Sequence, residues 1–218
     1  FYIPFVFVAI VWAISIHTVT AFLYVGLAGR SYWHNPIVAP RFLASAFAAG
    51  PALLILTFQL IRRHTRYWIG DEPIFMLRMI MTVAMLINVF LLGCEVFTEF
   101  YAPTAHSAAA RYLYFGLHGR DGLVPWIWTA IALDLAGLGL LVSPLSRRIG
   151  PLNIACISCF LGIWIEKGMG LIIPGFVPSP LGEVVEYLPS ANESLVCLGI
   201  WALGALIYSW MLHIAIPI

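Results

Sequence analysis

Six ionisable side chains lie inside apolar stretches of this sequence, and they are the residues best able to carry chemistry. In chain order they are His17, Glu95, Glu99, Asp134, Glu166 and Lys167. A charged side chain at the centre of a lipid bilayer costs at least about 2.5 kcal/mol. If the apolar stretches cross a membrane, each of these residues is therefore a candidate for a functional role.

Glu95 and Glu99 are four residues apart, so on a helix they share one face. Two carboxylates in a medium of low dielectric repel each other, and we expect one of them to hold a proton. A proton-transfer role is favoured for Glu95, whereas Glu99 could simply reach the aqueous boundary. Arg41 follows Pro40 and could pair with either acid, and such a pair would stabilise the buried charge without catalysis.

Asp134 and Glu166 complete the set of proton-transfer candidates with Glu95. Asp134 could extend a proton path inward, or it could only accept a hydrogen bond from Asn88. Glu166 and Lys167 are consecutive, so on a helix they are predicted to point in different directions and to need separate partners.

His17 lies within an apolar stretch near the start of the chain. A neutral imidazole offers one donor and one acceptor, which suits either a quinone carbonyl or a proton relay. A histidine that only hydrogen-bonds to a neighbouring helix is the alternative, and the sequence leaves both open.

The elements that position these residues are predicted from the apolar stretches, because about 20 apolar residues cross a bilayer as a helix. Backbone donors in lipid must be satisfied within the helix, and the stretches are too long for barrel strands. We therefore predict an all-α integral membrane protein, one domain over residues 1–218, with about six transmembrane helices. They run approximately over 2–27, 41–61, 74–97, 123–143, 150–164 and 194–216, and the fifth could continue through Glu166 to Gly170 before the prolines end it.

The composition excludes several classes of protein. Hydrophobic residues make up 62% and charged residues 10%, too few charges to cover a soluble domain. The net charge of +1 gives no sign of a nucleic-acid partner. His17 is the one histidine well inside a stretch, and Cys156 and Cys159 offer half the ligands of a cluster, so we expect no haem, iron–sulfur cluster or metal site.

The arginines of two short turns suggest the orientation of the chain. We place these turns, and with them both chain ends, on the cytoplasmic side; they hold Arg62, Arg63 and Arg66, and Arg147 and Arg148. The segment 168–189 then lies on the outer face. It is rich in glycine and proline but keeps apolar residues, which predicts an ordered loop packed on the membrane surface or on a partner.

Three segments carry a resemblance to a known family. Residues 15–23 (SIHTVTAFL) and 39–52 (APRFLASAFAAGPA) resemble the polysulfide reductase membrane subunit family, also called NrfD-like. Within it, residues 164–183 (WIEKGMGLIIPGFVPSPLGE) are most similar to the DsrP branch, the membrane subunits of dissimilatory sulfite-reductase-associated complexes. The chain starts at Phe1 rather than methionine, and we interpret it as the later part of a longer subunit.

The resemblance implies a haem-free subunit in the cell inner membrane that exchanges electrons between menaquinone and a ferredoxin-like iron–sulfur subunit on the outer face. The complex would also contain cytochrome subunits and serve sulfur or sulfite metabolism. Members have eight to ten helices in two four-helix bundles, and this chain matches the later half, whereas the best-described quinone pocket belongs to the earlier one. His17, Arg41 and Glu166 match positions within the family's motifs.

We expect the quinone contacts at the outer end of the helices. His17, Tyr24, Trp33, Arg41 and Tyr101 are the candidates, with the aromatic rings forming an apolar slot and His17 or a tyrosine meeting a quinone oxygen. Two alternatives stay open: a structural anchor for the iron–sulfur subunit, in which the acids only pair with arginines, and a redox-coupled proton-translocating unit.

Overall fold

The computed structural model describes residues 2–101, 105–187 and 189–216, and this part of the chain is helical without strands. The helices are α1 (Ile3–Val25), α2 (Val38–His64), α3 (Asp71–Tyr101), α4 (Ala105–Phe115), α5 (Val124–Val142), α6 (Ile149–Lys167), α7 (Ile173–Phe176) and α8 (Ala191–Ala215). Short turns are η1 (Ser31–Trp33), η2 (Pro144–Arg147) and the π-helical η3 (Gly168–Ile172).

Six helices of the described chain are long and apolar enough to cross a membrane, as predicted. Five of them are α1, α2, α3, α5 and α8, and the sixth runs from Ile149 to Phe176 through α6, η3 and α7. This span is longer than the predicted stretch 150–164, because the glycines form a π-helical turn instead of ending the helix. Pro174 has no N–H to give to the Gly170 carbonyl four residues before it, and that carbonyl accepts instead from the Tyr32 hydroxyl at 3.1 Å.

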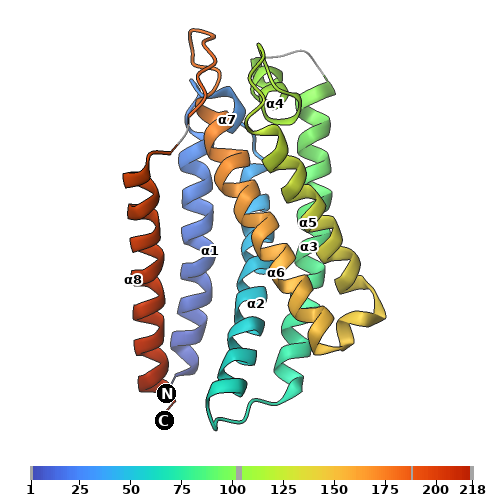
Figure 1. Ribbon diagram of the computed structural model, residues 1–218, viewed down its shortest axis with the longest axis vertical. Helices are drawn as coiled ribbons and strands as arrows, with labels where there is room; N and C mark the ends of the chain where they lie inside the picture. Colours follow the sequence, from blue (N-terminus) through green and yellow to red (C-terminus); the bar gives the residue numbers. More distant parts are fainter. Residues whose placement is uncertain (1, 102–104, 188, 217–218) are drawn as a thin grey trace.

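Helices α2, α3, α5 and α6 form a four-helix bundle around one apolar core (Figure 1). The core is built from small and medium-sized side chains such as Ala48, Met81, Ala155 and Cys156, all fully buried. Small residues let membrane helices approach closely, and this packing takes the place of the hydrophobic effect that drives association in water. The bundle is therefore the rigid frame that positions the buried charges.

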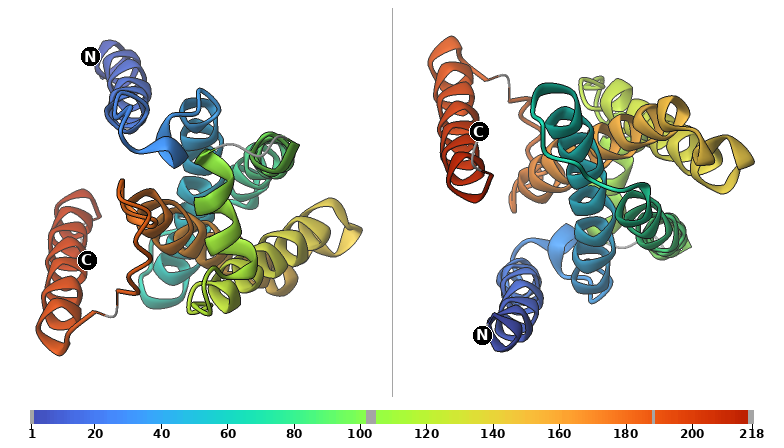
Figure 2. Two further views of the ribbon diagram at one scale, coloured as in Figure 1. Left: turned by 90° about the horizontal axis from the view of Figure 1, so that it is seen from above. Right: turned by 90° about the horizontal axis from the view of Figure 1, so that it is seen from below.

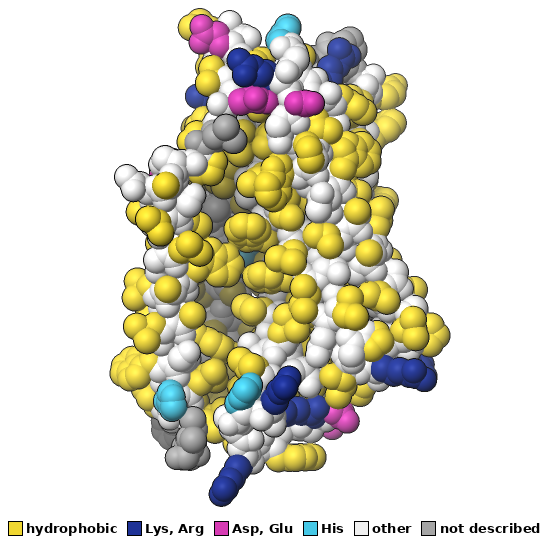
Figure 3. Space-filling model, viewed as in Figure 1, with side chains coloured by type: hydrophobic (Ala, Val, Ile, Leu, Met, Phe, Trp, Pro, Cys, Tyr) yellow, Lys and Arg dark blue, Asp and Glu magenta, His cyan; other side chains and the backbone are white. Residues whose placement is uncertain are grey.

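Helices α1 and α8 lie outside the bundle (Figure 2). Helix α1 contacts α2 and buries only Ala21, and α8 buries none of its described residues. Their apolar side chains cover the surface together with those of the bundle, as the space-filling view shows (Figure 3). Surfaces of this kind are suited to lipid or to other membrane helices.

One end of the bundle is covered by α4, η1 and α7, and we call it the roofed end. The turns 65–70 and 143–148 and both chain ends lie at the opposite end, which agrees with the predicted topology (Figure 1). Trp33 connects η1 to η3 and α7. Its Nε1 donates to the Leu171 carbonyl at 2.8 Å, and its ring packs edge-on against Phe176. Helix α4 was not anticipated, since the connection before residue 123 carries no long apolar stretch.

Replacing Gly175 with alanine is expected to destabilise this roof. The new Cβ would overlap the indole ring of Trp33, so the ring must move and its bond to Leu171 must break. Overpacking of this kind costs about 1–3 kcal/mol. Thermal unfolding in detergent would show it as a lower midpoint, with Gly168→Ala as the control because a Cβ there meets no atom within 4 Å. Equal midpoints for the two variants would contradict the packing described.

Candidate functional site

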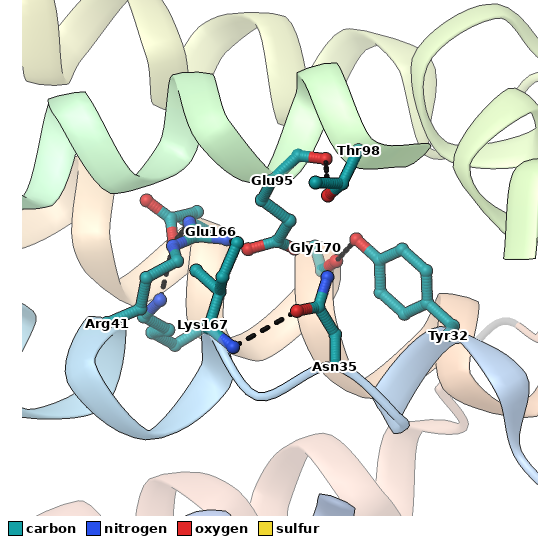
Figure 4. Close-up of polar contacts among 9 residues, drawn as sticks. Tyr32, Asn35, Arg41, Glu95, Thr98, Glu166, Lys167 and Gly170 are labelled. Atoms are coloured by element: carbon teal, nitrogen blue, oxygen red, sulfur yellow. Dashed lines mark hydrogen bonds and ion pairs between the residues drawn. The ribbon is translucent and has the colours of Figure 1, made fainter. Parts of the chain in front are cut away.

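Four charged side chains from three helices meet inside the bundle near its roofed end (Figure 4). Arg41 of α2 uses Nη1 to pair with Glu95 of α3, and Nη2 to donate to Glu166 of α6. The Lys167 Nζ lies 2.7 Å from the same oxygen of Glu166. We call Arg41, Glu95, Glu166 and Lys167 the charge cluster.

The charge cluster is almost closed to solvent. The side chains of Arg41, Glu95 and Glu166 are exposed by 5%, 9% and 4%, and that of Lys167 by 20%. The guanidinium holds two carboxylates from different helices and so links α2, α3 and α6. The predicted pairing of Arg41 with a glutamate of the third helix is confirmed, and the partner is Glu95. Glu99 is buried one turn further toward the roof, on the same face of α3.

The prediction that Glu166 and Lys167 need separate partners was wrong. Consecutive residues do point away from each other at their Cβ atoms, but the four-carbon stem of lysine is long and flexible. In this structure it returns to the Glu166 carboxylate. Glu166 therefore faces two cations, Arg41 and Lys167.

Asp134 of α5 extends the polar groups toward the bundle centre. It is 1% exposed and lies against Gly162, which is one turn before Glu166 on α6. Of the two alternatives for Asp134, the hydrogen bond from Asn88 is not formed, because in the described part of the chain the Asp134 carboxylate oxygens have no hydrogen-bond partner. Buried polar groups without partners are costly, so binding of a water molecule or a proton at Asp134 would be stabilising.

Two tyrosines of the roof face the charge cluster, and no pattern in the sequence pointed to either. Tyr32 of η1 and Tyr114 of α4 line, with the charge cluster, a cavity of about 10 Å³, roughly the space of one water molecule. Burial raises the pKa of Tyr114 to about 12, opposed by the Arg41 charge. Burial likewise raises the pKa of Tyr32 well above its usual value. Both hydroxyls are therefore protonated at physiological pH and can donate hydrogen bonds.

Comparison with known proteins places the chain in a family. The family model for polysulphide reductase, NrfD, matches residues 1–178. The chain belongs to the NrfD family. A protein of Halobacterium salinarum described as a putative membrane subunit of dimethyl sulfoxide reductase is 25% identical over 89% of this chain and 49% of its own length. An Hdr-like menaquinol oxidoreductase integral membrane subunit of Archaeoglobus fulgidus is 24% identical over 92% of this chain and 54% of its own.

This NrfD-family chain is thus a multi-pass membrane protein that spans about half the length of the curated relatives it matches. The family match over residues 1–178 takes in all three helices that supply the charge cluster. Among the described residues, no group of three or more histidine, cysteine or acidic side chains is arranged to hold a metal ion.

The five residues predicted to contact quinone are not gathered in one place in this NrfD-family chain. Tyr24 and Trp33 lie together, with ring centroids 4.9 Å apart. Trp33 is 2% exposed and part of the roof, whereas Tyr101 is 76% exposed and packs on Phe97 of its own helix. Arg41 belongs to the charge cluster. Their roles in binding quinone stay predictions.

His17 is half-buried on α1, outside the bundle. Its Nδ1 lies 2.8 Å from the Ala13 carbonyl of the same helix. A carbonyl only accepts, so Nδ1 carries the hydrogen and, in the neutral ring, Nε2 is the acceptor. The nitrogen left for a ligand is therefore one that can take a proton from a hydroxyl.

Proposed function

We propose that this chain is part of the membrane subunit of a quinone-linked redox complex, and that it handles the protons that accompany electron transfer. The observation that carries the proposal is the charge cluster, which is buried inside a membrane-spanning bundle. Charged side chains inside a membrane are expensive and mark substrate, ion or proton pathways, and a buried ion pair is weak evidence for a purely stabilising role. Membership in the NrfD family and the names of both relatives support a redox complex.

Menaquinone is the proposed quinone, and a ferredoxin-like iron–sulfur subunit on the outer face is the proposed electron partner. One relative is named a menaquinol oxidoreductase subunit, which supports the first assignment. The roofed end would then be the outer face of the cell inner membrane. Further proposals, which rest on the family resemblance of residues 164–183, are cytochrome-containing partner subunits and a link to sulfur or sulfite metabolism.

The residues fit a quinone at the edge of the bundle rather than inside the charge cluster. The cavity beside Arg41 holds about one water, far less than a naphthoquinone ring requires. An apolar groove of about 560 Å³ between α2 and α3 begins at Pro40, the neighbour of Arg41, and is open to lipid. His17 on α1 is likewise reachable from the lipid. A bound quinol supplies two electrons and two protons when it is oxidised.

The chain's own groups would move those protons. His17 Nε2, the acceptor nitrogen of the neutral ring, would take a proton from the quinol hydroxyl. Glu95 and Glu166 can pass such a proton on, because Arg41 and Lys167 stabilise the carboxylate that remains when the proton leaves. Asp134 offers a further carboxyl group one helical turn inward from Glu166.

Replacing His17 with alanine, or Glu95 with glutamine, is expected to slow menaquinol oxidation by the complete complex. General acid–base groups contribute about 10²–10⁴-fold, so a loss of at least roughly a hundredfold is expected in each variant. Turnover with a soluble menaquinol analogue is the measurement, made at equal amounts of assembled complex. His213→Ala is the control, because His213 lies near the end of α8 at the opposite end of the bundle. Unchanged turnover in both variants would reject these roles.

A structural anchor for the iron–sulfur subunit is the second candidate function. It is favoured by the observation that Arg41, Glu95, Glu166 and Lys167 are all engaged in ion pairs with one another. It also fits the segment after α7, where Leu181, Val185 and Tyr187 expose apolar side chains at the roofed end. A cryo-EM map of the complex that shows lipid tails and no quinone headgroup beside His17 and Arg41 would favour the anchor.

A redox-coupled proton-translocating unit is the third candidate, and it needs a hydrated path that joins Glu95 and Asp134 to both faces. Inward of Asp134 the bundle centre is filled by the apolar core, including Met81, Met85 and Leu152. This arrangement favours proton exchange with the roofed end alone. Protons released at the opposite end by liposome-reconstituted complex during turnover would support translocation instead.

A further inference from the structure

A cleft of about 560 Å³ opens on the surface of the roofed end. It lies between η1, α4, α7 and the loops that follow α4 and α7. Arg30, Ser31, His118 and Ser179 contribute polar groups to its lining, so the cleft is suited to water.

Tyr32 lines both this cleft and the small cavity beside the charge cluster. Its side chain is buried, and its hydroxyl donates to the Gly170 carbonyl at 3.1 Å (Figure 4). Gly170 lines the cavity as well. Tyr32 is therefore the residue shared by the surface cleft and the cavity that Arg41, Glu95 and Glu166 line.

The buried carboxyl groups need a route by which they exchange protons with water. Besides Glu99, three buried carboxyl groups, those of Glu95, Glu166 and Asp134, share two cations, Arg41 and Lys167, so neutrality leaves at least one of the three to carry a proton. That proton must come from water, and the apolar core closes the path from the opposite end. The roofed end offers the shorter connection.

We propose that protons pass between the surface cleft and the charge cluster at Tyr32. The hydroxyl gives its proton to the water or carboxylate in the cavity and takes another from water in the cleft, so no charge and no net proton is left on the tyrosine. The neutral hydroxyl has one donor and two acceptor positions, which this exchange requires. Its bond to Gly170 holds it in place between transfers. The inference rests on the proton role proposed for the charge cluster.

Hydrogen–deuterium exchange of the buried protonated carboxyl tests the route without any quinone turnover. Its C=O stretch is followed by infrared spectroscopy after transfer of the complete subunit, in its complex and in nanodiscs, into D₂O. Asp134→Asn and Glu95→Gln identify the band. Tyr32→Phe is expected to slow the exchange by at least roughly tenfold, because the hydroxyl is lost while the ring still closes the cavity. Tyr32→Ala is expected to speed it.

Tyr112→Phe is the matched control, since Tyr112 is a buried roof tyrosine that lines neither the cleft nor the cavity. A second measurement blocks the cleft itself: Ser179→Cys labelled with a bulky maleimide is expected to slow exchange in an otherwise unchanged protein. Exchange that is indifferent to Tyr32→Phe and to the label overturns the route. Exchange that depends on both in a complex that fails to oxidise menaquinol leaves the route standing and rejects the proposed function.

Discussion

Replacing Arg41 with leucine is expected to lower the free energy of unfolding by about 3–5 kcal/mol. The change removes the cation that pairs with Glu95 and one of the two cations that face Glu166. A buried carboxylate without a counter-charge is strongly unfavourable, and in this bundle the same residue also links α2, α3 and α6. Titration with SDS in mixed micelles, followed by circular dichroism, measures the loss.

Arg62→Leu is the control for this prediction. Arg62 also pairs with an acid, Asp71, at 2.8 Å, but the Asp71 side chain is 64% exposed. Ion pairs with an exposed partner contribute roughly 0–1 kcal/mol, and Arg62 also donates to the Ile69 carbonyl, so the control is expected to lose clearly less stability than Arg41→Leu. Glu95→Gln added to Arg41→Leu is expected to recover part of the stability, because it removes the unpaired carboxylate. Equal losses for Arg41→Leu and Arg62→Leu would show that burial of the charge cluster does not dominate its energetics.

Replacing Gly162 with valine is the second change with a large expected effect. Even the Cβ of alanine at this position would overlap the Asp134 carboxylate and lie 3.0 Å from the Ala130 carbonyl. The Asp134 side chain can turn away, but the backbone of α5 can only retreat, so α5 and α6 must separate. We expect a loss of about 3 kcal/mol, at the upper end of the cost of overpacking.

The same change is expected to disturb the proton groups, since Asp134 is held against Gly162 and Glu166 lies one turn further along α6. Gly139→Val is the control, because a Cβ at Gly139 on α5 meets no atom within 4 Å. Both variants carry the same β-branched residue in a helix, so the difference between their SDS midpoints isolates the contact. A stable Gly162→Val protein with native midpoint would contradict the close approach of α5 and α6.

Together these changes separate two contributions at the candidate site. The small residues of α5 and α6 set how closely the helices approach, and Arg41 sets which carboxylates can be buried between them. Loss of either is expected to affect both stability and proton transfer. Tyr32→Phe, by contrast, keeps the shape of the side chain and the charges of the cluster, and is expected to act mainly on proton transfer.

Local patterns in the chain were enough to predict the six membrane spans and the residues that had to be buried with charge. Long apolar stretches suffice for this, because in lipid the backbone satisfies its hydrogen bonds only within each helix, so each span forms independently of the others. The sequence also predicted that Arg41 pairs with Glu95 or Glu99, and the structure shows that the partner is Glu95. Arg41 and Glu95 lie near the same end of neighbouring helices, and pairing with an acid offsets the cost of an arginine in lipid.

Which groups share one site became visible only in the packed bundle. That Glu166 joins Arg41, that Lys167 returns to Glu166, and that Asp134 lies against Gly162 depend on the rotation and separation of packed helices, which no local pattern records. The structure of the roof could not be predicted from the sequence for a related reason. Helix α4 and Tyr32 lie in connections of mixed composition, whose conformation follows from the bundle end they cover rather than from a requirement of the bilayer.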